Sequence, residues 1–204
     1  MQIENSTQSF KANLIATSGK RSLYKVTDSA DIIALKKFSK KTDFKTLMPQ
    51  NSKTESDRWH EMLEYAIDMA ENPGNVTYVE SFNNKLCGII TYFPNSTTTI
   101  DCICTIPVQI GEKVKLAGKT LFYQVFKDFL DNKGSRIKLS AITNGPYNTI
   151  NKYADLGFKE TTDSTATYVN MSANQYKIKE AMKLLNKIIP YKSENKKVRL
   201  EELI

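Results

Sequence analysis

Residues 113–120 combine small side chains with lysines, and a helix is expected to begin within this stretch. The first turn of a helix leaves about four backbone N–H groups unpaired and carries about half a positive charge. Those groups can hold a diphosphate, provided that no bulky side chain blocks its approach. The small residues are Ala117, Gly118 and Thr120, and the cations are Lys113, Lys115 and Lys119. The stretch therefore predicts a phosphate site; a plain helix start, in which Gly118 only packs, is the alternative.

The cysteines and the histidine have spacings that disfavour thiol and metal chemistry. Cys102 and Cys104 lie two apart on a predicted strand, so both face one side, whereas the single histidine, His60, lies in an early helix. A nucleophilic thiol needs a base within reach, and a structural zinc site needs more ligands than one histidine without a Cys-x-x-Cys pair. We therefore predict core thiols, a surface or packing role for His60, no metal and a reducing compartment.

The spacing of apolar residues along the chain predicts the helices and strands that position these residues. Apolar residues at spacings of three and four predict a helix from about residue 56 to 72. Alternation then predicts three antiparallel strands over 76–81, 86–93 and 98–106, with a hairpin turn at Asn83-Asn84. The other predicted elements are strands 23–26, 136–142 and 165–171 and helices 29–38, 118–132, 148–156 and 173–189.

This order predicts an α+β fold with a mixed, mostly antiparallel central sheet flanked by helices. We expect one domain over 1–172, beginning with an irregular arm over 1–20. Residues 173–204 form a basic C-terminal helix followed by a charged tail, which is expected to be mobile after Pro190.

The formal net charge of +7 is concentrated at the two ends of the chain. Residues 1–54 hold ten Lys/Arg against four acids, and residues 173–204 hold eight against four, so the middle is acidic. Such flanks attract phosphates or acidic partners, although a solvated lysine-rich surface is the plainer interpretation. The N-terminus has no signal-peptide pattern and no apolar run reaches a membrane span, so we expect a cytoplasmic protein without membrane contact.

From about residue 76 to 171 the chain resembles the GNAT superfamily of N-acyltransferases. The family carries Gln/Arg-x-x-Gly-x-Gly/Ala at the start of the helix after its fourth strand. Lys113 falls on the first position of that motif, Leu116 on the first glycine and Gly118 on the Gly/Ala position. The resemblance implies a GNAT-like fold in which residues 113–120, Val114 included, bind the diphosphate of acetyl-CoA. Leu116 and a longer preceding loop depart from the family pattern.

A second segment, residues 151–158, resembles the family's Tyr-x-x-Leu-Gly-Phe pattern. Gly157 then ends a short helix and Phe158 enters the core. Tyr153 falls where the family often has a tyrosine near the acyl-CoA sulfur. A phenol with a pKa near 10 stays protonated at neutral pH and can protonate a departing thiolate. The resemblance therefore implies that Tyr153 is the catalytic acid, with a half-buried packing tyrosine as the alternative; Asn148 is a weaker candidate for a cofactor contact.

In the family the strand before that phosphate loop splays from its parallel neighbour, which frees backbone groups to pair with the pantetheine arm. On this chain those groups belong to Cys104, Thr105 and Ile106. The base that removes a proton from the amine is not identified. Asp101 and Glu80 are candidates, and an outward, solvated acid is the alternative for each.

The resemblance implies an enzyme that transfers an acetyl group from acetyl-CoA to a primary amine, mostly by positioning. Backbone N–H groups of the splayed strand would polarise the acyl carbonyl. The basic flanks favour a macromolecular acceptor, either a protein amine or an aminoacyl-tRNA, and the last helix could pair two subunits. The alternative is a catalytically inactive protein of this fold that binds an acidic protein or nucleic acid through its flanks.

Overall fold

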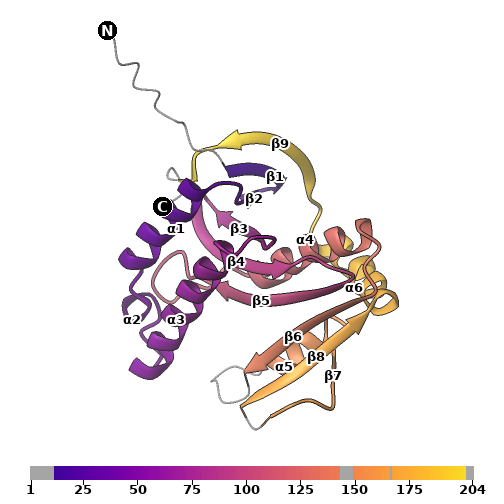
Figure 1. Cartoon of the computed structure of the whole chain (residues 1–204). Helices are drawn as coiled ribbons and strands as arrows, with labels where there is room; N and C mark the ends of the chain where they lie inside the picture. Colours follow the sequence, from indigo (N-terminus) through magenta and orange to yellow (C-terminus); the bar gives the residue numbers. More distant parts are fainter. Residues whose placement is uncertain (1–11, 143–148, 166, 201–204) are drawn as a thin grey trace.

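The computed structural model describes residues 12–142, 149–165 and 167–200 (Figure 1). Within them, nine strands form one sheet in the order β7-β8-β6-β5-β4-β3-β2-β1-β9. All neighbouring strands are antiparallel except β5 and β6, which are parallel. The strands are β1 Ala12–Ser18, β2 Arg21–Lys25, β3 Val76–Phe82, β4 Lys85–Phe93, β5 Thr97–Thr105, β6 Arg136–Ile142, β7 Lys159–Glu160, β8 Tyr168–Asn174 and β9 Lys192–Val198.

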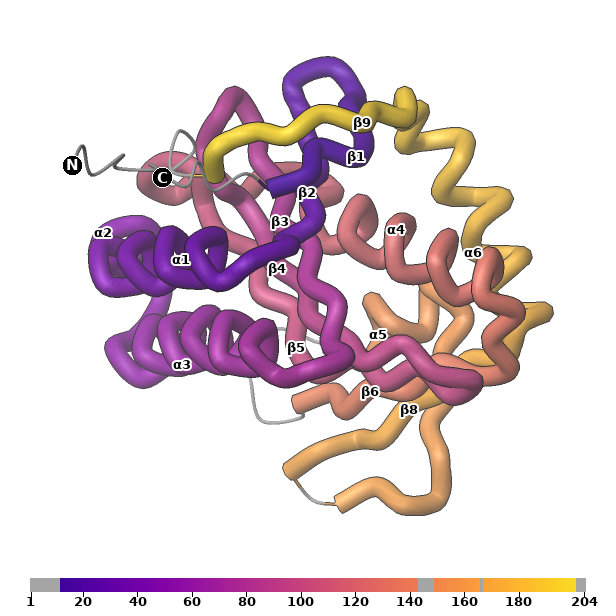
Figure 2. Tube along the Cα trace, turned by 45° about the horizontal axis from the view of Figure 1, so that its top comes forward, coloured from indigo at the N-terminus to yellow at the C-terminus, as the bar shows by residue number. Residues whose placement is uncertain are grey.

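Helices cover both faces of this sheet, and each face has its own apolar core (Figure 2). Helices α1 to α3 lie on one face, whereas α4 and α6 lie on the other, where the side chains of α5 also pack. The helices are α1 Ser29–Lys41, α2 Phe44–Leu47, α3 Lys53–Ala70, α4 Ala117–Asp131, α5 Thr149–Ala154 and α6 Gln175–Ile188. The predicted α+β class with a mixed, mostly antiparallel sheet is confirmed.

Local sequence explains most of these boundaries. Ser52 and Glu55 form a reciprocal capping box that starts α3 at Lys53, a few residues earlier than the apolar stripe alone predicts. Asn83 and Asn84 both have positive φ, as a two-residue hairpin turn between β3 and β4 requires. At the end of α4, the N–H of Gly134 donates to the carbonyl of Phe129 at 2.8 Å, which closes the last turn.

Two segments near the ends of the chain, residues 12–18 and 192–198, form strands that their sequences do not predict. Residues 12–18, expected to belong to an irregular arm, form β1, and the charged tail after Pro190 forms β9, which pairs with β1. The β9 segment has Val198 as its only apolar residue, so no alternation marks it, and backbone pairing with β1 holds it in place.

Helix α6 also belongs to the packed body. It buries Ile178, Ala181 and Leu185 in the core beside α4. Its outward face exposes Leu184 and Ile188, and pairing of two subunits through α6 stays a prediction. In the described parts of the chain, no helix combines the length and apolarity that crossing a bilayer requires.

Candidate active site

Strands β5 and β6 begin as parallel neighbours and then separate (Figure 1). They pair only over residues 97–99 of β5 and 136–138 of β6. On the other side of β5, Cys102 lies opposite Thr91 and Ile100 opposite Tyr92, so Asp101 is an extra residue in the ladder with β4. A β-bulge of this kind bends its strand. Beyond it, β5 follows β4 while β6 pairs with β8, so the facing edges of β5 and β6 no longer pair, and we call this region the opening.

The peptide groups that face this opening are set by the alternation of the β4–β5 ladder. The N–H of Ile106 donates to the carbonyl of Cys87 at 2.8 Å, so Ile106 is engaged with β4. Since successive residues of a strand point their peptide groups to opposite sides, Cys104 also faces β4, whereas Ile103 and Thr105 face the opening. This corrects the expectation that Cys104 and Ile106 offer free groups, retains Thr105 and adds Ile103, which the sequence did not indicate.

The start of α4 lies beside the open end of β5. A Cβ placed on Gly118 would lie 3.7 Å from Thr105 Cγ2 and 3.9 Å from Ile103 Cδ1, both ordinary contacts. Within the described residues, the N–H groups of Gly118 and Lys119 form no hydrogen bond. Unpaired donors at a helix start, beside strand peptides that no neighbouring strand pairs, suit a ligand with an anionic end and an amide-bearing arm.

Leu116 takes the backbone conformation that glycine favours. It caps α4 at φ 71° and ψ 3°, in the left-handed region, and its side chain makes no capping hydrogen bond. This conformation costs a non-glycine residue about 1–2 kcal/mol. The loop therefore retains the turn for which a glycine is suited, although a leucine occupies the position. Around it, Lys113 and Lys115 are exposed and Val114 and Lys119 are half-buried.

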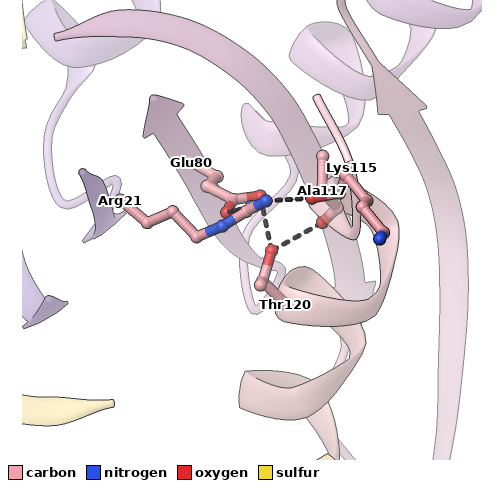
Figure 3. Close-up of polar contacts among 5 residues, drawn as sticks. All are labelled: Arg21, Glu80, Lys115, Ala117 and Thr120. Atoms are coloured by element: carbon pink, nitrogen blue, oxygen red, sulfur yellow. Dashed lines mark hydrogen bonds and ion pairs between the residues drawn. The ribbon is translucent and has the colours of Figure 1, made fainter. Parts of the chain in front are cut away.

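A buried polar network lies behind this loop (Figure 3). Arg21 Nη1 lies 2.5 Å from Glu80 Oε1, and Thr120 Oγ1 lies 2.5 Å from Glu80 Oε2. Arg21 Nη2 also donates to the backbone carbonyl of Lys115, and Thr120 Oγ1 lies 2.7 Å from the carbonyl oxygen of Ala117. Glu80 is 0% exposed, so it cannot contact an incoming amine. The structure therefore corrects the interpretation of Glu80 as a candidate base.

Burial of Glu80 makes folding stability dependent on pH. Desolvation raises its pKa to about 7, against the hydrogen bonds from Thr120 and Cys87 and the positive charge of Arg21. Tyr191, whose own pKa rises through burial and the charge of Glu80, also faces the group.

Because the folded chain binds the Glu80 proton more tightly than the unfolded chain, this group's contribution to stability is complete below about pH 4.5 and is lost as pH rises to about 7. We expect the free energy of unfolding of Glu80→Gln, relative to wild type, to rise by roughly 3 kcal/mol between pH 4.5 and 8. Urea denaturation of both proteins across this range measures the difference. A difference that does not change with pH would contradict the raised pKa.

Tyr153 lies on α5 within an aromatic cluster. Its ring centroid is 5.7 Å from that of Phe122 on α4 and 6.3 Å from that of Phe158. Burial, and then interaction with Cys102 of β5, raise the pKa of Tyr153 to about 12. The hydroxyl therefore holds its proton at neutral pH. Asn148, the other candidate near this helix, lies outside the described residues.

Asp101, the extra residue of the bulge, has a hydrogen-bond partner outside its own strand. Its Oδ2 accepts a hydrogen bond from Asn75 Nδ2 at 3.1 Å, and burial raises its pKa above the ordinary value of 3.8. The pKa of Tyr65 on α3 is raised by burial and then by the charges of Asp101, Cys102 and Tyr168. Asp101 is itself half-buried, and Tyr65, whose pKa its charge raises, is about half exposed.

Cys102, Cys104 and His60 lie on the α3 side of the fold. Cys102 Sγ is 3.3 Å from the carbonyl oxygen of Met62, and Cys104 Sγ is 3.8 Å from that of Trp59. Both thiols are buried, as predicted for core residues. His60 Nε2 lies 3.4 Å from Glu64 Oε1 on the helix surface. Among the described residues, no three His, Cys, Asp or Glu side chains gather as a metal site would require.

A cavity of about 400 Å³ lies at the other end of α4, away from the opening. Its lining includes Asp128, whose carboxylate accepts hydrogen bonds from Tyr78 and Tyr92 at 2.5 Å and from Gln124 at 2.7 Å. Because those donors already occupy the carboxylate and none of the opening's residues lines this cavity, we assign the site to the opening.

The structure is similar to solved structures of acetyltransferases. PaiA N-acetyltransferase from Thermoplasma acidophilum, in complex with coenzyme A, is 16% identical with a TM-score of 0.53; the match covers 75% of this chain and 99% of that chain. Spermidine N-acetyltransferase SpeG from Vibrio cholerae, solved as a single-residue mutant, is 14% identical with a TM-score of 0.51. That match covers 79% of this chain and 97% of that chain. FdhC, a nucleotide-linked sugar GNAT, is 13% identical with a TM-score of 0.51, and the match covers 88% of this chain and 94% of that chain.

Neither a protein-family model nor a curated protein sequence matches this chain. The structural likeness establishes the fold, which is that of the GNAT N-acetyltransferases, and the expectation of a GNAT-like fold is confirmed. The substrates named for these neighbours differ from one another.

Proposed function

We propose, from the GNAT fold of this chain, that it is an acyl-CoA-dependent N-acyltransferase that transfers an acetyl group from acetyl-CoA to a primary amine. One observation carries the proposal: β5 and β6 part beside a helix start whose N–H groups are unpaired. An extended ligand with a diphosphate at one end and amides along its arm matches both features.

The residues at the opening fit such a ligand. The N–H groups of Gly118 and Lys119 would hold the diphosphate, with positive charge from Lys113 and Lys115. The peptide groups of Ile103 and Thr105 would pair with the arm, as an added strand pairs with a sheet edge. Acetyl-CoA, when bound, supplies an acyl group activated as a thioester.

Asp101 on β5 and Tyr153 on α5 divide the proton transfers. Asp101 Oδ removes a proton from the acceptor ammonium, directly or through a water, because its carboxylate is only half-buried and an amine or a water can reach it. Tyr153 Oη gives its proton to the departing sulfur, and a backbone N–H group of β5 nearer the bulge polarises the acyl carbonyl. Most of the rate acceleration comes from holding amine and thioester together.

For the acceptor we propose an amine on a polyanionic macromolecule. Parts of the two basic flanks, far apart in sequence, lie together at one edge of the sheet because β9 pairs with β1. Exposed Lys192, Lys196 and Lys197 of β9 thereby join Lys20, which follows β1. Such a surface attracts phosphates in a salt-dependent way. The buried free thiols fit a reducing compartment, and we propose the cytoplasm.

Calorimetric titration with acetyl-CoA at low and at physiological salt tests the proposal. Micromolar affinity is expected, followed by acetylation of tRNA-bound or protein amines in an assay with labelled acetyl-CoA. Acetylation of small amines alone would remove the macromolecular acceptor and leave the enzyme. Absence of acetyl-CoA binding at both salt concentrations would overturn the proposed function and favour a catalytically inactive binding protein.

A further inference from the structure

The Arg21–Glu80–Thr120 network results from the register of β2 and β3. Arg21 lies opposite Phe82, and Glu80 lies two residues away on the same face of β3. The guanidinium passes over the Phe82 ring, 5.6 Å from its centroid, and so reaches Glu80. Both strands thereby present a charged pair to the start of α4.

The network contacts the loop through the loop's own backbone carbonyls. Arg21 makes two contacts through separate nitrogens. Nη1 binds Glu80, and Nη2 donates to the carbonyl of Lys115, the residue before the left-handed Leu116. Thr120 Oγ1 lies within hydrogen-bond distance of both Glu80 and the Ala117 carbonyl. A hydroxyl has one proton, so it can donate to only one of the two at a time. When Glu80 is protonated it donates to Thr120, and Thr120 then donates to Ala117.

The loop needs such support because its own sequence does not supply it. Leu116 holds a conformation that is unfavourable for a leucine, and no side chain caps α4. The contacts with Arg21 and Thr120 lie on either side of Leu116 in sequence. Arg21 itself is 14% exposed and points its charge into the pair with Glu80.

We propose that Arg21 and Glu80 are positioning residues that hold the β5–α4 loop in its diphosphate-binding conformation, an inference that rests on the proposed acyl-CoA site. They act through the carbonyl of Lys115 and the hydroxyl of Thr120. The affinity for CoA is thus set in part by two residues on strands that do not contact the ligand.

The test compares Arg21→Lys with Asp128→Asn. Arg21→Lys keeps a positive charge beside Glu80 but cannot bind it and the Lys115 carbonyl with two separate nitrogens. Asp128→Asn is the matched control, because it alters a hydrogen-bonded carboxylate at the other end of α4, bound to Tyr78 and Tyr92. Readouts are the melting temperature, the Kd for CoA by calorimetry, and hydrogen exchange of the Ala117 and Thr120 amides in the ligand-free protein.

Arg21→Lys is expected to raise the Kd for CoA by about tenfold and to accelerate exchange at both amides. Asp128→Asn is expected to lower the melting temperature without either change. Equal effects of the two variants on Kd and on exchange would overturn the positioning role. If wild type does not bind CoA, the proposed function fails; faster exchange in Arg21→Lys would then still show that the network holds the loop, and unchanged exchange would refute that as well.

Discussion

Gly118→Glu is expected to weaken CoA binding by about 100-fold or more while leaving the fold intact. The Cβ of residue 118 points toward Thr105 and Ile103, so a longer side chain fills the space between the start of α4 and the open end of β5. Its carboxylate would also lie next to the diphosphate, and the unpaired N–H groups would no longer be accessible. Calorimetry with CoA and a thermal melt measure the two halves of this prediction.

Gly118→Ala is the matched control. A single Cβ makes ordinary contacts at 3.7 and 3.9 Å, and alanine is more favourable than glycine in a helix by about 1 kcal/mol. We therefore expect a Kd close to that of wild type and a melting temperature that is equal or higher. Wild-type affinity in Gly118→Glu would place the diphosphate elsewhere, and loss of affinity in Gly118→Ala would indicate that the loop tolerates no side chain.

Tyr153→Phe is expected to lower kcat by about 100-fold or more without changing the Kd for CoA. Phenylalanine keeps the ring contacts with Phe122 and Phe158, so packing is preserved and only the proton donor is lost. Because the pKa of Tyr153 is raised to about 12, the wild-type rate should show no fall from its ionisation below about pH 10. Steady-state kinetics with saturating acceptor measure kcat.

Asp101→Asn, measured in the same assay, distinguishes the role of the base from that of the acid Tyr153. A base must be ionised, so the wild-type rate should rise with pH through the pKa of Asp101, which burial places above 3.8. The asparagine variant should be slow and lack this rise, whereas Tyr153→Phe should keep it. A Tyr153→Phe enzyme as fast as wild type would reduce Tyr153 to a packing residue, and an unchanged profile in Asp101→Asn would exclude that carboxylate as the base.

Local patterns in the sequence determined the elements whose stability is local. The Asn83-Asn84 turn, the three strands that it helps to join, and the amphipathic α3 and α4 were all predictable, because hairpin geometry and side-chain periodicity depend on neighbouring residues. The start of α4 at Ala117, one residue before the predicted Gly118, was predictable for the same reason. Even Leu116, which departs from the family motif, keeps the backbone conformation that the glycine would favour.

Contacts between distant segments decided the rest. Glu80 looks like any acid in an alternating strand, and only the approach of Arg21 and Thr120, 59 and 40 residues away, makes it a buried support for the loop. The bulge at Asp101 and the parting of β5 from β6 depend on where β4 and β8 pair, which no local period encodes. β9 has no apolar alternation and exists because β1 offers an edge. Periodicity reports which face a residue occupies, whereas long-range pairing decides what that face meets.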